Sequence, residues 1–186
     1  ITPKTRLIIL CSPSNPTGSV YSKEELEGLA NVIKRHEDLF VLADEIYEHI
    51  NYVGKHESIA QFEGMKERTI IVNGVSKAYA MTGWRIGYIA APEWIVKGCN
   101  KLQGQYTSGP CSVSQKAAEF AYTADQSCVE EMRLAFERRR NLIVELAKDI
   151  PGLEVNVPEG AFYLFPKCSS FYGKSDGATT INNSTD

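Results

Sequence analysis

The sequence lacks the features that mark membrane proteins, secreted proteins and nucleic-acid-binding proteins. No apolar run approaches the roughly 20 residues that a membrane-spanning helix needs, and no signal-peptide pattern opens the chain. The net charge is only −3, which gives no general attraction to nucleic acid or to anionic membranes. We therefore expect no nucleic-acid partner and no membrane partner.

Cysteine and histidine are too few and too irregularly spaced for a disulfide framework or a metal site. The five cysteines form no Cys-x-x-Cys pair and their number is odd. The three histidines, His36, His49 and His56, have no metal-site spacing. We expect surface or capping roles for these histidines, no bound metal, and a reducing cytoplasmic location.

The chain is long enough for one ordinary domain, or for one domain plus part of another, at 186 residues. Its hydrophobic fraction of 43% and charged fraction of 23% are typical of a globular protein. The first residue is Ile1 rather than Met, so we expect an excised or processed piece of a longer protein.

Apolar runs alternate with a helical pattern along the first half of the chain. Buried strands are predicted at 6–11, 39–43 and 69–72, and a fourth apolar strand at 86–91. Ser22 and Glu25 form a capping box that begins a helix after the first strand. This alternation predicts an α/β domain with a mostly parallel sheet and flanking helices. The last strand follows too closely for a helical crossover, so it is expected to be antiparallel to its neighbour or further across the sheet.

The second half of the chain is predicted to be mostly helical. One helix begins at Glu93, a second spans about 112–122 and a third spans about 125–149. The third carries an apolar stripe and a basic run, 138–140, which we interpret as a solvated face. The stripe consists of Val129, Met132, Phe136, Ile143 and Leu146.

Two short strands, 153–157 and 161–165, are expected after the long helix, followed by a polar tail that is a loop or disordered. We place a domain junction in the long helix. Residues 1–125 would form part of a large domain, and residues 126–186 the linking helix and the start of a smaller α+β domain.

Polar side chains follow three of the predicted strands. Asn15 follows the first, Asp44 and Tyr47 follow the second, and Lys77 follows the third. Ligands of open α/β sheets bind beyond the carboxyl ends of the strands, so we expect these side chains to converge on one crevice. Each has a structural alternative: a turn for Asn15, a helix cap or ion pair for Asp44, and packing for Tyr47.

The stretch 73–88 contains a lysine in a loop after a buried strand and, eight residues later, Arg85. Burial of a lysine lowers its pKa and makes its amine nucleophilic. An arginine holds a phosphate through its planar fork. A carbonyl cofactor with a phosphate tail would suit both Lys77 and Arg85.

The pattern Ser-Lys-x-x-x-Met-Thr-Gly-Trp-Arg-Ile-Gly-Tyr at 76–88 resembles the lysine motif of pyridoxal-phosphate-dependent aminotransferases of fold type I, in the class I/II, aspartate-aminotransferase-like branch. Asn-Pro-Thr-Gly at 15–18 and Asp-x-x-Tyr at 44–47 are similar to motifs of the same family, in the same order. The resemblance covers nearly the whole chain and implies pyridoxal 5′-phosphate as cofactor, amino acid and 2-oxo acid substrates, and a homodimer.

Chemistry and resemblance assign the same roles. Lys77 would form the Schiff base with the cofactor and then move the proton as general acid and base. Asp44 would keep the pyridine nitrogen protonated, because an opposite charge nearby favours the charged form.

The remaining positions would hold the rest of the cofactor and the substrate. Tyr47 and Asn15 would donate to the phenolic oxygen, and Arg85 with Ser76 would bind the phosphate. The resemblance also implies that Asn15 touches the substrate carboxylate and that 107–108 reaches across a dimer interface.

The sequence departs from the family in several respects. Family members are considerably longer, and the glycine-containing phosphate loop, the aromatic residue that stacks on the ring and the C-terminal substrate arginine are not in this sequence. Gly74 stands where some relatives carry serine. We expect the central part, truncated at both ends, of an aminotransferase acting on aspartate or a related amino acid. The alternatives are a lyase or synthase on the same fold, and a chain that is catalytically silent by itself.

Overall fold

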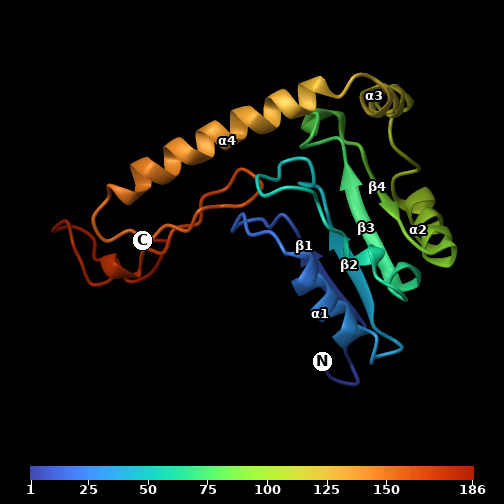
Figure 1. Cartoon of the computed structure of the whole chain (residues 1–186), viewed down its shortest axis with the longest axis horizontal. Helices are drawn as coiled ribbons and strands as arrows, with labels where there is room; N and C mark the ends of the chain where they lie inside the picture. Colours follow the sequence, from blue (N-terminus) through green and yellow to red (C-terminus); the bar gives the residue numbers. More distant parts are fainter.

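A single mixed sheet organises the computed structural model, which describes residues 1–186. Its strands are β1 (Leu7–Cys11), β2 (Phe40–Asp44), β3 (Thr69–Gly74) and β4 (Gly87–Ala90), in the order β1-β2-β3-β4. β1, β2 and β3 are parallel, and β4 is antiparallel to β3 (Figure 1). The predicted α/β class with a mostly parallel sheet is confirmed, and so is the antiparallel last strand.

Helix α1 (Lys23–Ile33) covers one face of this sheet. Ser22 accepts from the N–H of Glu25 and the Glu25 carboxylate accepts from the N–H of Ser22, so the predicted capping box is present. Leu26, Ala30 and Ile33 lie one helical turn apart and pack on β2. The core that they form consists of Leu26, Ala30, Ile33, Leu39, Val41, Ala43, Ile59 and Met65.

The opposite face of the sheet has little cover within these residues. Leu7 is 45% exposed and Ile9 is 68% exposed, so the prediction of a fully buried first strand is wrong. Successive side chains of a strand point to opposite faces, which leaves Ile8 and Leu10 against the core and Leu7 and Ile9 outside it. Phe40 on this face contacts the Trp94 ring, with 5.5 Å between centroids.

Three helices follow the sheet: α2 (Glu93–Tyr106), α3 (Ser112–Thr123) and α4 (Ser127–Lys148). They match the predicted helices closely, and short 3₁₀ turns lie at Ile59–Gln61, Lys66–Arg68, Thr82–Trp84 and Ser169–Phe171. α4 extends away from the sheet towards the C-terminal part of the chain (Figure 1). No helix combines the length and hydropathy that a membrane span requires.

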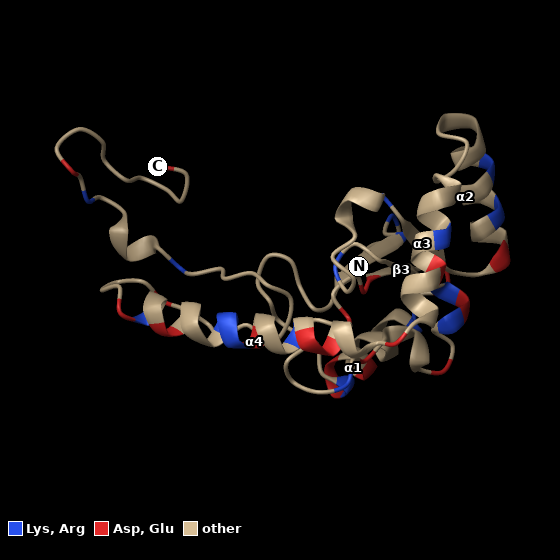
Figure 2. Cartoon of the chain, turned by 90° about the horizontal axis from the view of Figure 1, so that it is seen from above, with Lys and Arg blue, Asp and Glu red and all other residues tan.

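The predicted apolar stripe of α4 is only partly correct. Val129 is buried, but in the second half of the helix Val144 and Ala147 are the buried residues, whereas Ile143 is 49% exposed. Charges of both signs lie along this helix (Figure 2). The basic run is not uniformly solvated either, because Arg140 donates to the carbonyl of Pro158 and lies over the Tyr52 ring.

The two short strands expected after α4 are absent, and this prediction is wrong. The segment makes only isolated bridges, Asn51 with Gly160 and Glu154 with Lys167. Its backbone instead bonds to loops at the end of the sheet: the N–H groups of Glu159 and Gly160 both donate to the carbonyl of Gly18 at 2.8 Å. Ala161 has a left-handed φ of 57°, which interrupts an extended strand. The tail after it is a loop with one 3₁₀ turn.

Candidate active site at the carboxyl ends of the parallel strands

The three parallel strands end at the same edge of the sheet, β1 and β2 level with each other and β3 two residues further on. Cys11 pairs in register with Asp44, and Asp44 with Val72, so the loops that follow the strands leave from the same edge of the sheet. The arrowheads of β1, β2 and β3 point to this edge (Figure 1), and the loops beyond them contain the residues that the sequence singled out.

The loop after β1 is compact and brings Asn15 to this edge. The N–H of Gly18 donates to the carbonyl of Ser14 at 2.9 Å, and the Ser12–Pro13 and Asn15–Pro16 peptide bonds are cis. The Asn15 side chain is exposed and open to a ligand, while the Asn15 N–H reaches the Cys11 sulfur. Burial is the main cause that raises the pKa of the Cys11 thiol.

Asp44 is the last residue of β2 and is half-buried. Its Oδ1 accepts from the N–H of Ile46 at 3.2 Å, and its other oxygen has no hydrogen bond. A half-buried carboxylate with one unused oxygen is a suitable partner for a protonated ring nitrogen.

Tyr47 and Lys77 meet in space although 30 positions separate them in sequence. The Lys77 Nζ lies 5.6 Å from the centroid of the Tyr47 ring and 5.4 Å from that of Phe162. The Tyr47 side chain is buried, and the Lys77 side chain is half-buried. The amine therefore lies against aromatic faces rather than in open water.

Ser76 and Arg85 share a cavity with Asp44. The cavity measures about 290 Å³ and is also lined by Ile46, Val72, Asn73, Ile86 and Gly87. Arg85 is exposed, has a left-handed φ of 56° and donates through Nη1 to the carbonyl of Thr82 at 2.9 Å. Its remaining N–H groups are free to bind an anion.

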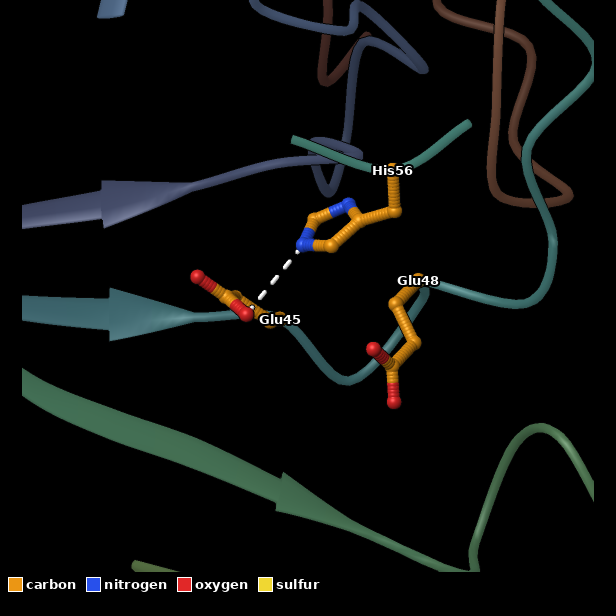
Figure 3. Close-up of side chains that lie close together, drawn as sticks. All are labelled: Glu45, Glu48 and His56. Carbon is orange, nitrogen blue, oxygen red and sulfur yellow. Dashed lines mark ion pairs between the residues drawn. The ribbon is translucent and has the colours of Figure 1, made fainter. Parts of the chain in front are cut away.

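A polar network that the sequence did not predict lies directly behind Asp44. The buried Glu45 accepts from the Ser58 hydroxyl at 2.6 Å, and its other oxygen lies 3.2 Å from the Nε2 of His56. Figure 3 shows the Glu45 carboxylate facing the imidazole of His56. Only 13% of the His56 side chain is exposed, so the predicted surface or capping role is wrong for this histidine.

The neighbouring Glu48 points away from the His56 ring in Figure 3. It accepts from the Asn73 amide at 2.8 Å and lies 3.3 Å from the Nε2 of His49. These contacts couple the ends of β2 and β3. Glu45, Glu48 and His56 offer ligand atoms within 4.8 Å of one another, but both carboxylates already have protein partners, so the group is a structural network.

Phe162 and Tyr163 are the other residues that sequence reasoning did not place at the site. Tyr163 hydrogen-bonds to Tyr47, with 2.5 Å between the hydroxyl oxygens. The signal available was an aromatic pair one residue after a Pro-Glu-Gly turn, but only the fold shows that this turn reaches the strand ends.

The comparisons with known proteins agree with this arrangement. The model of the family "Aminotransferase class I and II" matches residues 1–176. The chain belongs to this family. It is 51% identical, over 99% of its own length and 40% of the relative's, to the bifunctional aspartate aminotransferase and glutamate/aspartate-prephenate aminotransferase of Petunia hybrida. It is 52% identical, over 91% of its length and 35% of the relative's, to the aspartate aminotransferase of Pinus pinaster.

Solved structures give the same result. The aspartate aminotransferase of Rhizobium meliloti matches with a TM-score of 0.95 at 45% identity, over 100% of this chain and 47% of that one. The aromatic aminotransferase of Pyrococcus horikoshii matches with a TM-score of 0.85 at 46% identity, over 89% of this chain and 45% of that one. The chain thus spans less than half the length of these relatives.

Proposed function

We propose that this chain is the cofactor-binding part of a pyridoxal 5′-phosphate-dependent aminotransferase that moves an amino group from aspartate, or a related amino acid, to a 2-oxo acid. The observation that supports it most is the gathering of Lys77, Asp44, Tyr47 and Arg85 at one edge of the sheet. An amine, a carboxylate, a phenol and a guanidinium are the groups that this cofactor requires.

The residues present fit the cofactor. Asp44 has an unused oxygen, Arg85 has unused donors, and a cavity of about 290 Å³ lies between them. Asp44 would face the ring nitrogen, Arg85 and the Ser76 hydroxyl would hold the phosphate, and Lys77 would attach the aldehyde carbon. When bound, the cofactor supplies an electron sink for the bond that breaks at the substrate Cα.

The protein groups supply binding and proton transfer. Asp44 keeps the ring nitrogen protonated through its negative charge. Tyr47 and Asn15 would donate to the phenolic oxygen, and Asn15 would also bind the substrate carboxylate. The Lys77 amine would take the proton from the substrate Cα as a general base and would deliver it, as a general acid, to the cofactor carbon that had carried the aldehyde.

The names of the relatives support aspartate as the amino donor. The Pinus pinaster relative is named an aspartate aminotransferase, and the Petunia relative is also named for prephenate. We propose a homodimer, with the exposed residues 107–108 at the interface, in a reducing compartment such as the cytoplasm. All five cysteines are free, which agrees with that compartment. The division into 1–125 and 126–186 stays a prediction.

The test is amino transfer by the whole protein that carries this chain, with Lys77→Ala beside Lys97→Ala. Lys97 is an exposed lysine on α2 paired with Glu93, so its variant should keep full activity. Lys77→Ala should lose at least about 10³-fold in turnover, because the attachment point and the general base go together. Near-normal turnover by Lys77→Ala would contradict the proposal.

Product identity separates this proposal from a lyase or synthase on the same fold. An aminotransferase forms one 2-oxo acid and one new amino acid in equal amounts, and both should appear. Release of ammonia without a new amino acid would favour a lyase. The isolated chain of 186 residues is expected to turn over no substrate by itself.

A further inference from the structure

The segment after α4 reaches into the site and contacts its two central side chains. The Tyr163 hydroxyl lies 2.5 Å from that of Tyr47. The Phe162 ring lies 5.4 Å from the Nζ of Lys77 and makes an edge-to-face contact with the Tyr47 ring, also at 5.4 Å between centroids. This aromatic pair therefore forms a wall of the site that comes from beyond the sheet.

Backbone contacts fix this wall in place. The N–H of Ala161 donates to the carbonyl of Ile50 at 2.7 Å, and the Tyr52 hydroxyl donates to the carbonyl of Ala161. A Cβ at Gly160 would lie 2.6 Å from the Cβ of Pro13, so the backbone of this segment is pressed against the loop that carries Asn15. The position of Tyr163 is thus set by the strand-end loops.

The hydrogen-bonding capacity of a phenol decides which of the two hydroxyls, Tyr47 or Tyr163, donates to the other. A tyrosine hydroxyl has one proton to donate and two lone pairs that accept. If the Tyr47 proton is directed to the phenolic oxygen of the cofactor, its oxygen is left to accept, and Tyr163 is the hydroxyl within reach. A hydroxyl that accepts a hydrogen bond becomes a stronger donor.

The surroundings of Tyr47 keep its proton in place. The titratable groups that face it are Tyr163, Cys11, Asp44 and Lys77. Burial raises the pKa of Tyr47 above its ordinary value. Tyr47 is therefore a neutral donor throughout the physiological pH range.

We propose that Tyr163 is a positioning residue of the site, which donates its hydroxyl proton to the Tyr47 oxygen and so directs the Tyr47 proton at the phenolic oxygen of the bound cofactor. The proposal rests on the proposed function. It extends the site to the segment that follows α4.

The test compares Tyr163→Phe with Tyr52→Phe in this chain. Both variants lose one hydroxyl that contacts this wall, but only Tyr163 touches Tyr47. Each variant is mixed with pyridoxal phosphate, and the pH midpoint at which the visible absorption of the bound cofactor changes is measured. Tyr163→Phe should move this midpoint upward by roughly half a pH unit, because a weaker Tyr47 donor leaves the phenolic oxygen more basic. Tyr52→Phe keeps the bond from the Ala161 N–H to Ile50 and the contact of Gly160 with Pro13, which still hold the wall, and it should leave the midpoint unchanged.

A midpoint unchanged in Tyr163→Phe, or moved equally in both variants, would overturn the proposal and leave the proposed function intact. A second measurement needs no cofactor. The denaturation midpoints of Tyr47→Phe, Tyr163→Phe and the double variant form a cycle. The denaturation midpoint of the double variant should fall by less than the sum of the decreases in the two single variants.

The cycle also separates the two proposals. If the unmodified chain takes up no cofactor at Lys77, the proposed function fails for this chain and the cycle alone decides the pair. If the decrease in the double variant equals the sum of the two single decreases, the positioning role of Tyr163 is overturned. A double variant whose denaturation midpoint falls no further than that of Tyr47→Phe alone would support the Tyr47–Tyr163 pairing on which the positioning role depends.

Discussion

The two faces of the sheet differ sharply in what covers them. On the face under α1, Ile33 is 1% exposed and Val41 is fully buried. On the opposite face Ile9 is 68% exposed, although it stands in the same apolar run as the residues that face the core. Hydrophobicity of a strand therefore predicts that both faces are suited to burial, but not which face the chain itself covers.

A similar difference in exposure separates residues 158–163 from the second half of α4. Residues 158–163 are held against the strand-end loops by backbone hydrogen bonds. The second half of the helix lines one side of an apolar groove of about 530 Å³, in which Leu142, Ile143 and Leu146 are exposed, and residues of the 158–164 segment line the other side. Substitutions of buried or tightly held residues should therefore lower the stability more than substitutions of exposed residues.

The largest expected difference is between the two faces of the sheet. Ile33→Ala leaves a cavity between α1 and β2 and should lower the free energy of unfolding by about 2–5 kcal/mol. Ile9→Ala removes an exposed side chain and should change it by less than about 0.5 kcal/mol. Denaturant unfolding measures both. Equal losses would show that the second face is buried in solution, and a dependence on protein concentration would then reveal self-association.

Substitutions at the contact between residues 158–163 and the loop after β1 should have the next largest effect on stability. A Cβ at Gly18 would lie 2.5 Å from the Cβ of Pro158, and Gly18 has a φ of +71°. Gly18→Ala should cost about 1–3 kcal/mol through this clash and the left-handed backbone. Gly104→Ala in α2 has open space and should raise stability by up to about 1 kcal/mol. A stabilising Gly18→Ala would mean that the two segments do not touch.

The basic run of α4 gives a smaller and more specific contrast. Arg140 donates to the carbonyl of Pro158 and lies 4.8 Å from the Tyr52 ring centroid, whereas Arg138 is exposed. Arg140→Lys keeps the charge but loses the planar fork, and it should cost about 1 kcal/mol. Arg138→Lys should be neutral. Thermal unfolding of both variants decides whether the run is one solvated face, as its sequence suggested, or two environments.

The smallest expected effect on stability is that of the ion pair between Glu48 and the exposed His49. The His49 side chain lowers the pKa of Glu48, and the Glu48 carboxylate raises the pKa of His49. The stabilisation from His49 is complete below its ordinary value of 6.5 and is lost as the pH rises through its raised pKa. The stabilisation from Glu48 is present above 4.5 and is lost as the pH falls through its lowered pKa.

The Glu48–His49 pair should therefore contribute most between these two limits. Because much of the His49 side chain is exposed, solvent screening keeps this contribution below about 1 kcal/mol. His49→Gln should lower the unfolding free energy near pH 6 and have no effect at pH values well above the raised pKa. A loss that persists at high pH would contradict the ion pair.

Local sequence patterns predicted where the helices and strands lie better than they predicted what these elements pack against. The capping box at Ser22 and the apolar runs of β1, β2 and β3 are encoded in neighbouring residues, and the structure has them where predicted. The strands expected around Pro158 failed because that backbone finds its partners in Gly18 and Ile50, more than a hundred positions earlier. Such pairings leave no periodic trace in the sequence.

The candidate site shows the same division. Asn15, Asp44, Tyr47 and Lys77 were predictable because each follows a strand, and parallel strands bring such positions to one edge. His56, Phe162 and Tyr163 follow no strand. They reach the site through loops whose course depends on tertiary packing, and the aromatic pair that follows the Pro-Glu-Gly turn did not by itself place Phe162 and Tyr163 at the strand ends.

The most direct measurement is the visible absorption of this chain mixed with pyridoxal phosphate, followed by borohydride reduction and mapping of the labelled peptide. The Lys77 amine lies over the rings of Tyr47 and Phe162, 5.6 Å and 5.4 Å from their centroids. The proposal predicts a yellow complex and a label on Lys77. A label spread over exposed lysines such as Lys97, with none enriched at Lys77, would contradict it.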